Sequence, residues 1–208
     1  MLTVGEVRAR SPIVTAERIE GRINAHIEAI EQLRPSLPLI DRIAKSMIDS
    51  LTVQGTVYWL GNGGSAADSQ HFAAELVGRF EYDRPGLASI ALTANTSTLT
   101  AIGNDYGFDR IFARQVEALC KPKDCVMAIS TSGKSPNVLQ AVRSAKAIGA
   151  TTIGLTGYDG GELRQLADQC LVVPVRNTAV VQELHVLVCH ILCDLVEQYF
   201  FGEPTSKS

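Results

Sequence analysis

The segment TVYWLGNGGSAADSQHFAAEL occupies residues 56–76 and contains three local patterns in a row. Residues 56–60 form an apolar run of strand length, a glycine-rich turn follows, and residues 65–80 have the length of a helix. A strand that turns directly into a helix is the first half of a βαβ unit. In such a unit the helix carries the chain back, so that the next strand runs parallel to the first.

Short apolar runs alternate with helix-length segments along the rest of the chain. The predicted strands are residues 56–60, 88–92, 125–130, 151–155 and 170–175. The predicted helices are residues 65–80, 97–119, 135–148 and 162–167, with a long closing helix at 179–200. This alternation implies right-handed crossovers and a parallel sheet that is buried on both faces. We therefore predict an α/β fold with a doubly wound, five-stranded parallel sheet.

Two further helical patterns precede the first strand. Isoleucine recurs at helical spacing within residues 15–33, and a second periodic stretch covers residues 39–51 after two prolines. These patterns predict a helical N-terminal extension that packs on the domain and in an oligomer. We divide the chain into this extension, a sheet domain and a tail, at residues 1–54, 55–202 and 203–208.

The composition narrows the class of protein. Of 208 residues, 46% are hydrophobic and 20% charged, so the chain can bury a full core and is not disordered. A net charge of −3 offers no broad basic surface for nucleic acid or an acidic membrane. The apolar stretches fall short of a membrane span, and residues 1–11 lack the apolar core of a signal peptide. Five cysteines without a CxxC pair favour a reducing compartment, so we expect a cytoplasmic protein.

The glycine-rich loop at residues 61–65 permits two interpretations. With Ala66 it matches the G-x-G-x-x-A pattern of dinucleotide-binding folds. Those folds also need an acidic residue after the second strand to hold the ribose, and residues 92–95 contain no carboxylate. The pattern therefore gives little support to a dinucleotide site. A tight strand-to-helix turn would by itself explain two of the three glycines.

A second loop, STSGKS at residues 130–135, lies between the third strand and the next helix. Its ending imitates a Walker A motif, but the first glycine of that motif would fall on Ala128. Four hydroxyls stand beside a helix N-terminus, where free backbone N–H groups and the helix dipole attract an anion. An ordinary serine cap needs only one hydroxyl, so we favour a phosphate monoester site. The glycine-rich turn at residues 156–161 is typical of a structural turn.

His71 and Glu75 are candidate reacting groups on the first crossover helix. They are four residues apart, about 40° around the axis, and therefore project from one face. The pair could bind a metal or act as acid and base. The alternative interpretation is an ordinary surface pair, which the apolar neighbours of these residues weaken.

The closing helix carries polar groups within an apolar run: Gln182, Glu183, His185 and His190. Such groups need partners, so several of them must face a site or a subunit interface. Gln182 and His190 are about 12 Å apart along the axis, so either their side chains lean together or neighbouring subunits share a site. No chemical role is expected for the other candidates. We expect His185 in the core or an interface, Cys189 and Cys193 as small buried residues, and His26 on the surface.

Five ordered motifs together resemble the phosphoheptose isomerase family of sugar isomerase (SIS) domains: GNGGSAADSQHFAAEL, GNDYGF, AISTSGKS, LTGYDGG and QELHVLVCHILCDLVE. The resemblance implies a SIS-type, flavodoxin-like sheet and a homotetramer with shared active sites. It also implies the conversion of sedoheptulose 7-phosphate to D-glycero-D-manno-heptose 7-phosphate. That reaction is the first step towards nucleotide-activated heptose for glycoconjugates such as lipopolysaccharide.

The resemblance also implies roles for individual residues. One zinc ion per subunit would fall on His71, Glu75, Gln182 and His190. Substrate contacts would fall on Asn62, Gly63, Gly64, Ser65, Glu75, Asn104, Asp105, Ser130, Thr131, Ser132, Ser135 and Gln182. The catalytic pair would be Glu75 and His190, because ketose–aldose exchange through an enediol needs a base beside carbon and an acid beside oxygen. Ala179 stands where some relatives carry aspartate, and Val180, next to Val181, replaces a basic residue that is often found there.

Two rival interpretations share this resemblance. Replication-initiator-associating proteins have the same fold and act by binding the initiator, but they typically lack the residues that correspond to Glu75 and His190. This chain has both, which favours an enzyme. Related SIS enzymes act on other phosphosugars such as arabinose 5-phosphate, and those chains usually carry regulatory domains for which 208 residues leave no room.

Overall fold

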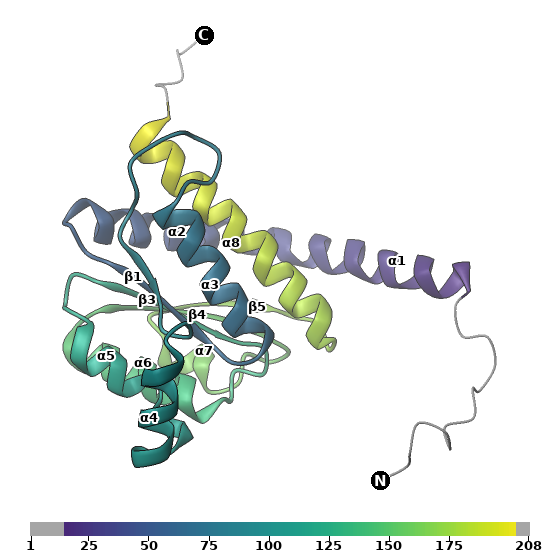
Figure 1. Ribbon diagram of the computed structural model, residues 1–208. Coiled ribbons are helices and arrows are strands. Elements are labelled where there is room, and N and C mark those ends of the chain that lie inside the picture. The colour runs from purple at the N-terminus through teal and green to yellow at the C-terminus, as the bar shows by residue number, and fades with distance from the viewer. Residues whose placement is uncertain (1–14, 203–208) are drawn as a thin grey trace.

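The computed structural model describes residues 15–202 (Figure 1). The expected tail at 203–208 and the first fourteen residues of the extension lie outside the described residues. The elements follow in the order α1 (Ala16–Leu33), η2 (Arg34–Ser36), α2 (Leu37–Thr52), β1 (Val57–Gly61), α3 (Gly64–Val77), β2 (Ser89–Ala91), α4 (Thr96–Tyr106), η3 (Phe108–Arg110), α5 (Ala113–Leu119), β3 (Cys125–Ser130), α6 (Pro136–Ile148), β4 (Thr151–Gly157), α7 (Leu163–Leu166), β5 (Gln169–Val173) and α8 (Thr178–Phe201).

The five strands form one sheet in the order β2-β1-β3-β4-β5, and every neighbouring pair is parallel. This arrangement confirms the predicted doubly wound sheet. The chain order reverses between β1 and β3, so the loops that follow these two strands open on either side of one crevice. These are the glycine-rich loop and the serine-rich loop.

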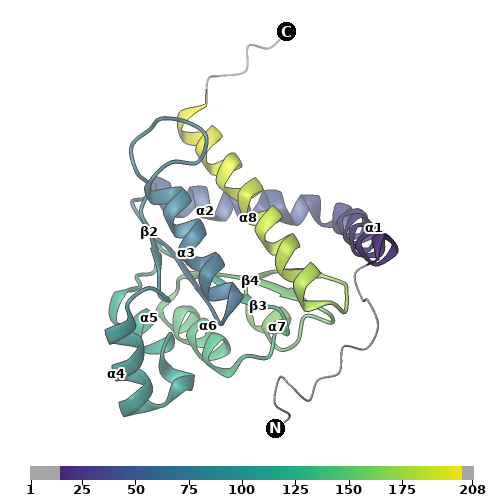
Figure 2. The ribbon, with the colours of Figure 1, turned by 45° about the vertical axis from the view of Figure 1, so that its right-hand side comes forward.

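Helices cover both faces of the sheet (Figures 1 and 2). Trp59 and Met127 belong to the core beneath α2, α3 and α8, whereas Tyr58 and Val126 pack with α5 and α6 on the other face. Successive residues of a strand point to opposite faces, so β1 and β3 need apolar residues towards both faces, and only Ser130 at the end of β3 is polar. All residues of these two strands are buried.

The predicted helix at residues 97–119 is wrong as a single element. It is divided into α4, η3 and α5, because Gly107 after α4 adopts φ +87° and ψ +158°. Such a positive φ is open to glycine and breaks the helical path. The periodicity of the sequence continues across this glycine, which is why the sequence suggested one helix.

The last helix, α8, buries ten of its 24 residues against the rest of the domain. Its 24 residues are long and apolar enough to cross a membrane by length and composition, which corrects our expectation that the apolar stretches fall short of a span. This is weak evidence for a membrane, because the core helix of a soluble protein passes the same test. Here α8 packs against α2, α3 and the strands β4 and β5.

The first helix, α1, extends away from the sheet domain in both views (Figures 1 and 2). Only Ala29 and Leu33 are buried, whereas Ile19, Ile23 and Ile27 are each more than half exposed. His26 was predicted to lie on the surface, and in the structure it also contacts α8. Its Nδ1 lies 3.0 Å from Oε2 of Glu183 on α8, which ties α1 to the last helix.

His185 on α8 is a buried core histidine, as expected, and its Nε2–H donates to the carbonyl oxygen of Thr156 at 3.1 Å. Burial lowers the pKa of His185 from 6.5 to about 4. Between these two values the unfolded chain binds a proton that the folded chain does not. The free energy of unfolding should therefore fall as the pH drops from 6.5, by about 2–3 kcal/mol at about pH 4.5.

The variant His185→Gln tests this dependence, because its amide can still donate to Thr156. We expect urea unfolding between pH 7 and about pH 4.5 to show a slope that is smaller than that of the wild type by close to one proton. An unchanged slope would mean that other groups cause the acid sensitivity.

Candidate active site

A reciprocal amide pair joins the two loops at the carboxyl edge of the sheet. Nδ2 of Asn62 donates to Oδ1 of Asn137 at 2.9 Å, and Nδ2 of Asn137 donates to Oδ1 of Asn62 at 2.8 Å. Asn62 belongs to the glycine-rich loop, and Asn137 is the second residue of α6, buried to 1% exposure. Asn137 was not predicted as a site residue, because an asparagine in the first turn of a helix has no distinctive pattern by itself.

The serine-rich loop leaves the start of α6 open. Ser135 is the N-cap of this 13-residue helix, yet its hydroxyl lies 3.0 Å from that of Ser130 and makes no cap bond within the described chain. Ser132 accepts a hydrogen bond from the backbone N–H of Lys134 at 3.2 Å. The hydroxyls and the helix N-terminus together offer donors to an anion. The interpretation as an ordinary serine cap does not describe this geometry.

The glycine-rich turn after β4 supports the serine-rich loop from behind. The N–H of Gly157 donates to the carbonyl of Thr131, and the N–H of Leu163 donates to the carbonyl of Gly133, each at 3.0 Å. The structural role expected for residues 156–161 agrees with these contacts. A cleft of about 250 Å³ opens beside the loop and is lined by Ser132, Lys134, Tyr158, Asp159 and Arg176.

Three titratable side chains from α3 and α8 meet at one point. The potential ligand atoms of His71, Glu75 and His190 all lie within 4.8 Å of one another. Nε2 of His71 is 3.0 Å from Oε1 of Glu75, and the rings of His71 and His190 have centroids 5.1 Å apart. Because His190 comes from a different helix, the cluster is more than the surface pair that the spacing alone allowed.

The cluster has the composition of a metal site. Two imidazoles and one carboxylate form a donor set that Zn²⁺ accepts at catalytic centres, where a fourth position stays open. His71 is 44% exposed and Glu75 is 23% exposed at the side chain, so solvent or a substrate can reach the group. The same residues can also accept and donate protons.

A family model for the SIS domain matches residues 22–157. A phosphoheptose isomerase of Trichlorobacter lovleyi is 49% identical over 185 residues, covering 88% of this chain and 94% of that protein. A phosphoheptose isomerase of Helicobacter hepaticus is 50% identical over 179 residues, covering 86% and 91%. A solved phosphoheptose isomerase from Francisella tularensis is similar with a TM-score of 0.86 and 40% identity, covering 89% of this chain and 100% of that chain.

The chain belongs to the phosphoheptose isomerase family. Membership confirms the predicted SIS-type fold and makes the chain an enzyme of the sugar-phosphate isomerase class.

Gln182 belongs to α8, and its side chain reaches the first turns of α3. Its Nε2 donates to Oδ2 of Asp68 at 3.0 Å, and a Cβ on Gly64 would lie 2.3 Å from that nitrogen. Burial raises the pKa of the Asp68 carboxyl, although the Gln182 amide and His71 oppose the shift. The structure thus places Gln182 beside Asp68, three residues before His71. Asp68 was missed because the motif offered no reason to single it out.

The remaining candidates divide into two groups. Ser65 is buried in the first turn of α3, two residues after the N-cap Gly63, which has φ +57°. Asn104 and Asp105 are exposed near the end of α4, and Nδ2 of Asn104 donates to Oδ1 of Asp105 at 2.8 Å. Within the described chain no side-chain hydrogen bond or ion pair joins these two residues to the cluster on α3 and α8.

Proposed function

We propose that this enzyme converts sedoheptulose 7-phosphate to D-glycero-D-manno-heptose 7-phosphate in the cytoplasm, as the first step towards nucleotide-activated heptose. The observation that carries the proposal is that Glu75 and His190 meet within one chain. Their helices, α3 and α8, pack on the sheet whose strand β3 leads into the serine-rich loop. The names of the relatives support the same substrate class.

The phosphate would bind at the serine-rich loop. Ser130, Thr131, Ser132 and Ser135 offer hydroxyls beside the open N-terminus of α6. An anion is favourable there without a surplus of basic residues, which agrees with a net charge of −3. The glycine-rich loop, with Asn62, Gly63, Gly64 and Ser65, would hold the sugar, and the amide pair fixes its position relative to the phosphate.

Glu75 and His190 would divide the proton transfers. Glu75 removes a proton from C1 of the ketose while His190 protonates O2, which gives the enediol. His190 then removes the proton from O1, and Glu75 delivers its proton to C2, which gives the aldose. Each group returns to its starting state, as acid–base catalysis requires.

A zinc ion, one per subunit, would be held by His71, Glu75, Gln182 and His190. When bound it supplies polarisation of the sugar oxygens O1 and O2. A carboxylate that ligates a cation is a weaker base. Glu75 therefore does not ligate the ion and abstract the carbon proton at the same moment.

The working enzyme would be a homotetramer with shared active sites. The exposed stripe of Ile19, Ile23 and Ile27 on α1 is an apolar surface that a second copy of the chain would cover. Asn104 and Asp105 lie away from Glu75 and His190 of their own chain, and would serve the site of a neighbouring subunit.

The direct test supplies the purified protein with Zn²⁺ and sedoheptulose 7-phosphate and follows the aldose product by NMR. We expect turnover of sedoheptulose 7-phosphate and no turnover of sedoheptulose, which lacks the phosphate group. Absence of turnover in the metal-supplied protein, together with tight binding to a replication initiator, would instead establish the non-catalytic alternative.

Mixing inactive subunits tests where the catalytic pair lies. Because Glu75 and His190 meet within one chain, oligomers that contain both Glu75→Gln and His190→Gln subunits should show no recovered activity. Differently tagged subunits verify that mixed oligomers form, and mixing each variant with wild-type subunits provides the positive control. Recovery above the activity of the separate variants would place the two groups on different subunits.

A further inference from the structure

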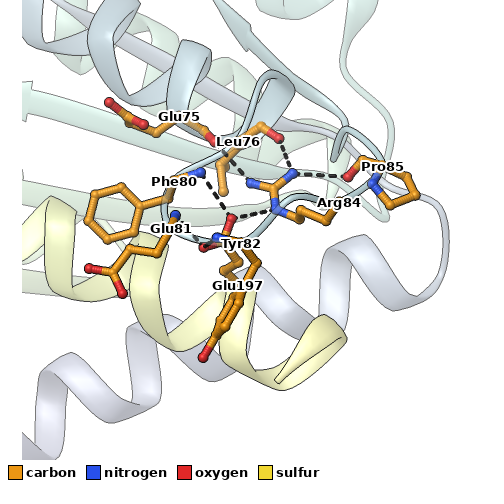
Figure 3. Close-up of polar contacts among 8 residues, drawn as sticks. All are labelled: Glu75, Leu76, Phe80, Glu81, Tyr82, Arg84, Pro85 and Glu197. Carbon is orange, nitrogen blue, oxygen red and sulfur yellow. Dashed lines mark hydrogen bonds and ion pairs between the residues drawn. The ribbon is translucent and has the colours of Figure 1, made fainter. Parts of the chain in front are cut away.

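A buried ion pair lies next to the catalytic cluster but contains none of its members (Figure 3). Nε of Arg84 lies 2.6 Å from Oε1 of Glu197, and both side chains are 1% exposed. Arg84 belongs to the segment between α3 and β2, whereas Glu197 lies in the last turns of α8. More than a hundred residues separate the two in sequence, so only the fold brings them together.

Every oxygen of the carboxylate is used. Oε1 of Glu197 also accepts the N–H of Phe80 at 2.9 Å, and Oε2 accepts the N–H groups of Glu81 and Tyr82 at 2.6 and 2.9 Å. Burial would raise the pKa of Glu197, but these N–H groups and the Arg84 guanidinium hold it below its ordinary value. A buried charge is tolerated only when its partners are satisfied in this way.

The guanidinium binds the end of α3. Nη2 of Arg84 donates to the carbonyl oxygen of Glu75 at 2.9 Å, and Nη1 donates to that of Leu76 at 2.9 Å and to that of Pro85 at 3.0 Å. The planar fork can meet several acceptors at once. In Figure 3 the dashed contacts thus run from α8 through Arg84 to the backbone of Glu75.

The carboxylate fixes the other member of the catalytic pair through Phe80. The Phe80 ring stacks on the imidazole of His190, with centroids 5.6 Å apart and an angle of 20° between the planes. The backbone N–H of Phe80 is held by Glu197. The segment that carries this ring has no helix or strand of its own, so its position depends on these side-chain contacts.

We propose that Arg84 and Glu197 are positioning residues that hold Glu75 and His190 in register, through the Glu75 carbonyl on one side and the Phe80 ring on the other. The proposal rests on the proposed function for the identity of the catalytic pair. It assigns no contact with the substrate to either residue. Glu75 and His190 come from different helices, and this network is anchored on both helices at once.

The test compares Arg84→Lys, Glu197→Gln and Phe80→Leu. Lysine keeps the charge but lacks the planar fork, glutamine directs an NH₂ group at backbone donors, and leucine removes the stacked ring. For each variant we expect kcat to fall about 10- to 100-fold and the affinity for Zn²⁺, measured by chelator competition, to fall about tenfold. KM for the sugar phosphate should change by less than about twofold, because the serine-rich loop is untouched. The conservative variant Phe80→Tyr should keep both wild-type values.

Asp124→Asn is the matched control. Asp124 is also a buried carboxylate that accepts backbone N–H groups, from Thr56 at 2.9 Å and Lys121 at 2.7 Å. It directly precedes β3, so it lies at the amino-terminal end of the strand whose other end leads into the serine-rich loop. This variant should lower the melting temperature while leaving kcat and Zn²⁺ affinity within about twofold of the wild type.

The outcomes separate this proposal from the proposed function. If folded Arg84→Lys, Glu197→Gln and Phe80→Leu proteins keep kcat and Zn²⁺ affinity within twofold, the positioning role is overturned. If Arg84→Lys or Glu197→Gln does not fold, kcat and Zn²⁺ affinity are compared between Phe80→Leu and Phe80→Tyr. Equal values in these two variants would overturn the positioning role. A wild-type protein without isomerase activity would end the proposed function, and the ratio of Zn²⁺ affinities would still confirm or overturn the positioning role.

Discussion

Replacing Glu75 by glutamine should lower kcat/KM for sedoheptulose 7-phosphate at least about 1,000-fold, and His190→Gln should do the same. General acid–base groups contribute about 10²- to 10⁴-fold each. Glu75 would act on carbon, where an amide cannot accept a proton at all. The two groups meet within 4.8 Å, so they act as one unit, and the double variant should be little worse than either single variant.

Proton exchange provides a second measurement for the same variants. In D₂O the wild type should exchange the C1 hydrogen of the ketose with solvent, and Glu75→Gln should abolish this exchange. Glu183→Gln is the matched control, because Glu183 is a glutamate on α8 that pairs with His26 instead of the cluster. It should keep wild-type turnover. Residual activity of Glu75→Gln within tenfold of the wild type would remove Glu75 from the carbon step.

The architecture was predictable because the apolar strands can be buried in only one kind of sheet. β1 and β3 are apolar at every position except Ser130, the last residue of β3, and only a sheet that is covered on both faces buries such runs. The division of the segment at residues 97–119 was not predictable, since a glycine within a periodic stretch can continue a helix. Gly107 has φ +87°, which ends α4, and η3 and α5 then pack against α6.

The site was predictable where the spacing along one helix brings groups together. His71 and Glu75 share a face of α3 by their spacing alone, but the arrival of His190 depends on how α8 crosses α3. Asn137 and Glu197 were missed for the same reason. Their partners, Asn62 and Arg84, are 75 and 113 residues away in sequence, and no local pattern predicts such pairs.

Gly133→Ala should produce the largest loss of stability among single substitutions at the proposed phosphate site. Gly133 has φ +64°, and a Cβ there would lie 2.0 Å from the carbonyl oxygen of Gly160 and 2.8 Å from Oγ1 of Thr156. Since the nearest obstacle is backbone, the two turns must separate. We expect the free energy of unfolding in urea to fall by about 3 kcal/mol or more. The affinity for the sugar phosphate should fall as well, because the turn after β4 supports the serine-rich loop.

Gly63→Ala separates the close approach from the cost of the backbone conformation. Gly63 has φ +57° and ψ −121°, a conformation that residues with a Cβ also avoid, but nothing lies within 4 Å of the Cβ position. Its alanine variant should therefore lose about 1–3 kcal/mol, the cost of a sparsely populated backbone conformation for a residue with a Cβ, and less than Gly133→Ala. The difference between the two variants measures how tightly the turn at residues 156–161 packs on the serine-rich loop. Equal losses would show that the loop can move away freely, and the interlocked turns would then not be what orders the phosphate hydroxyls.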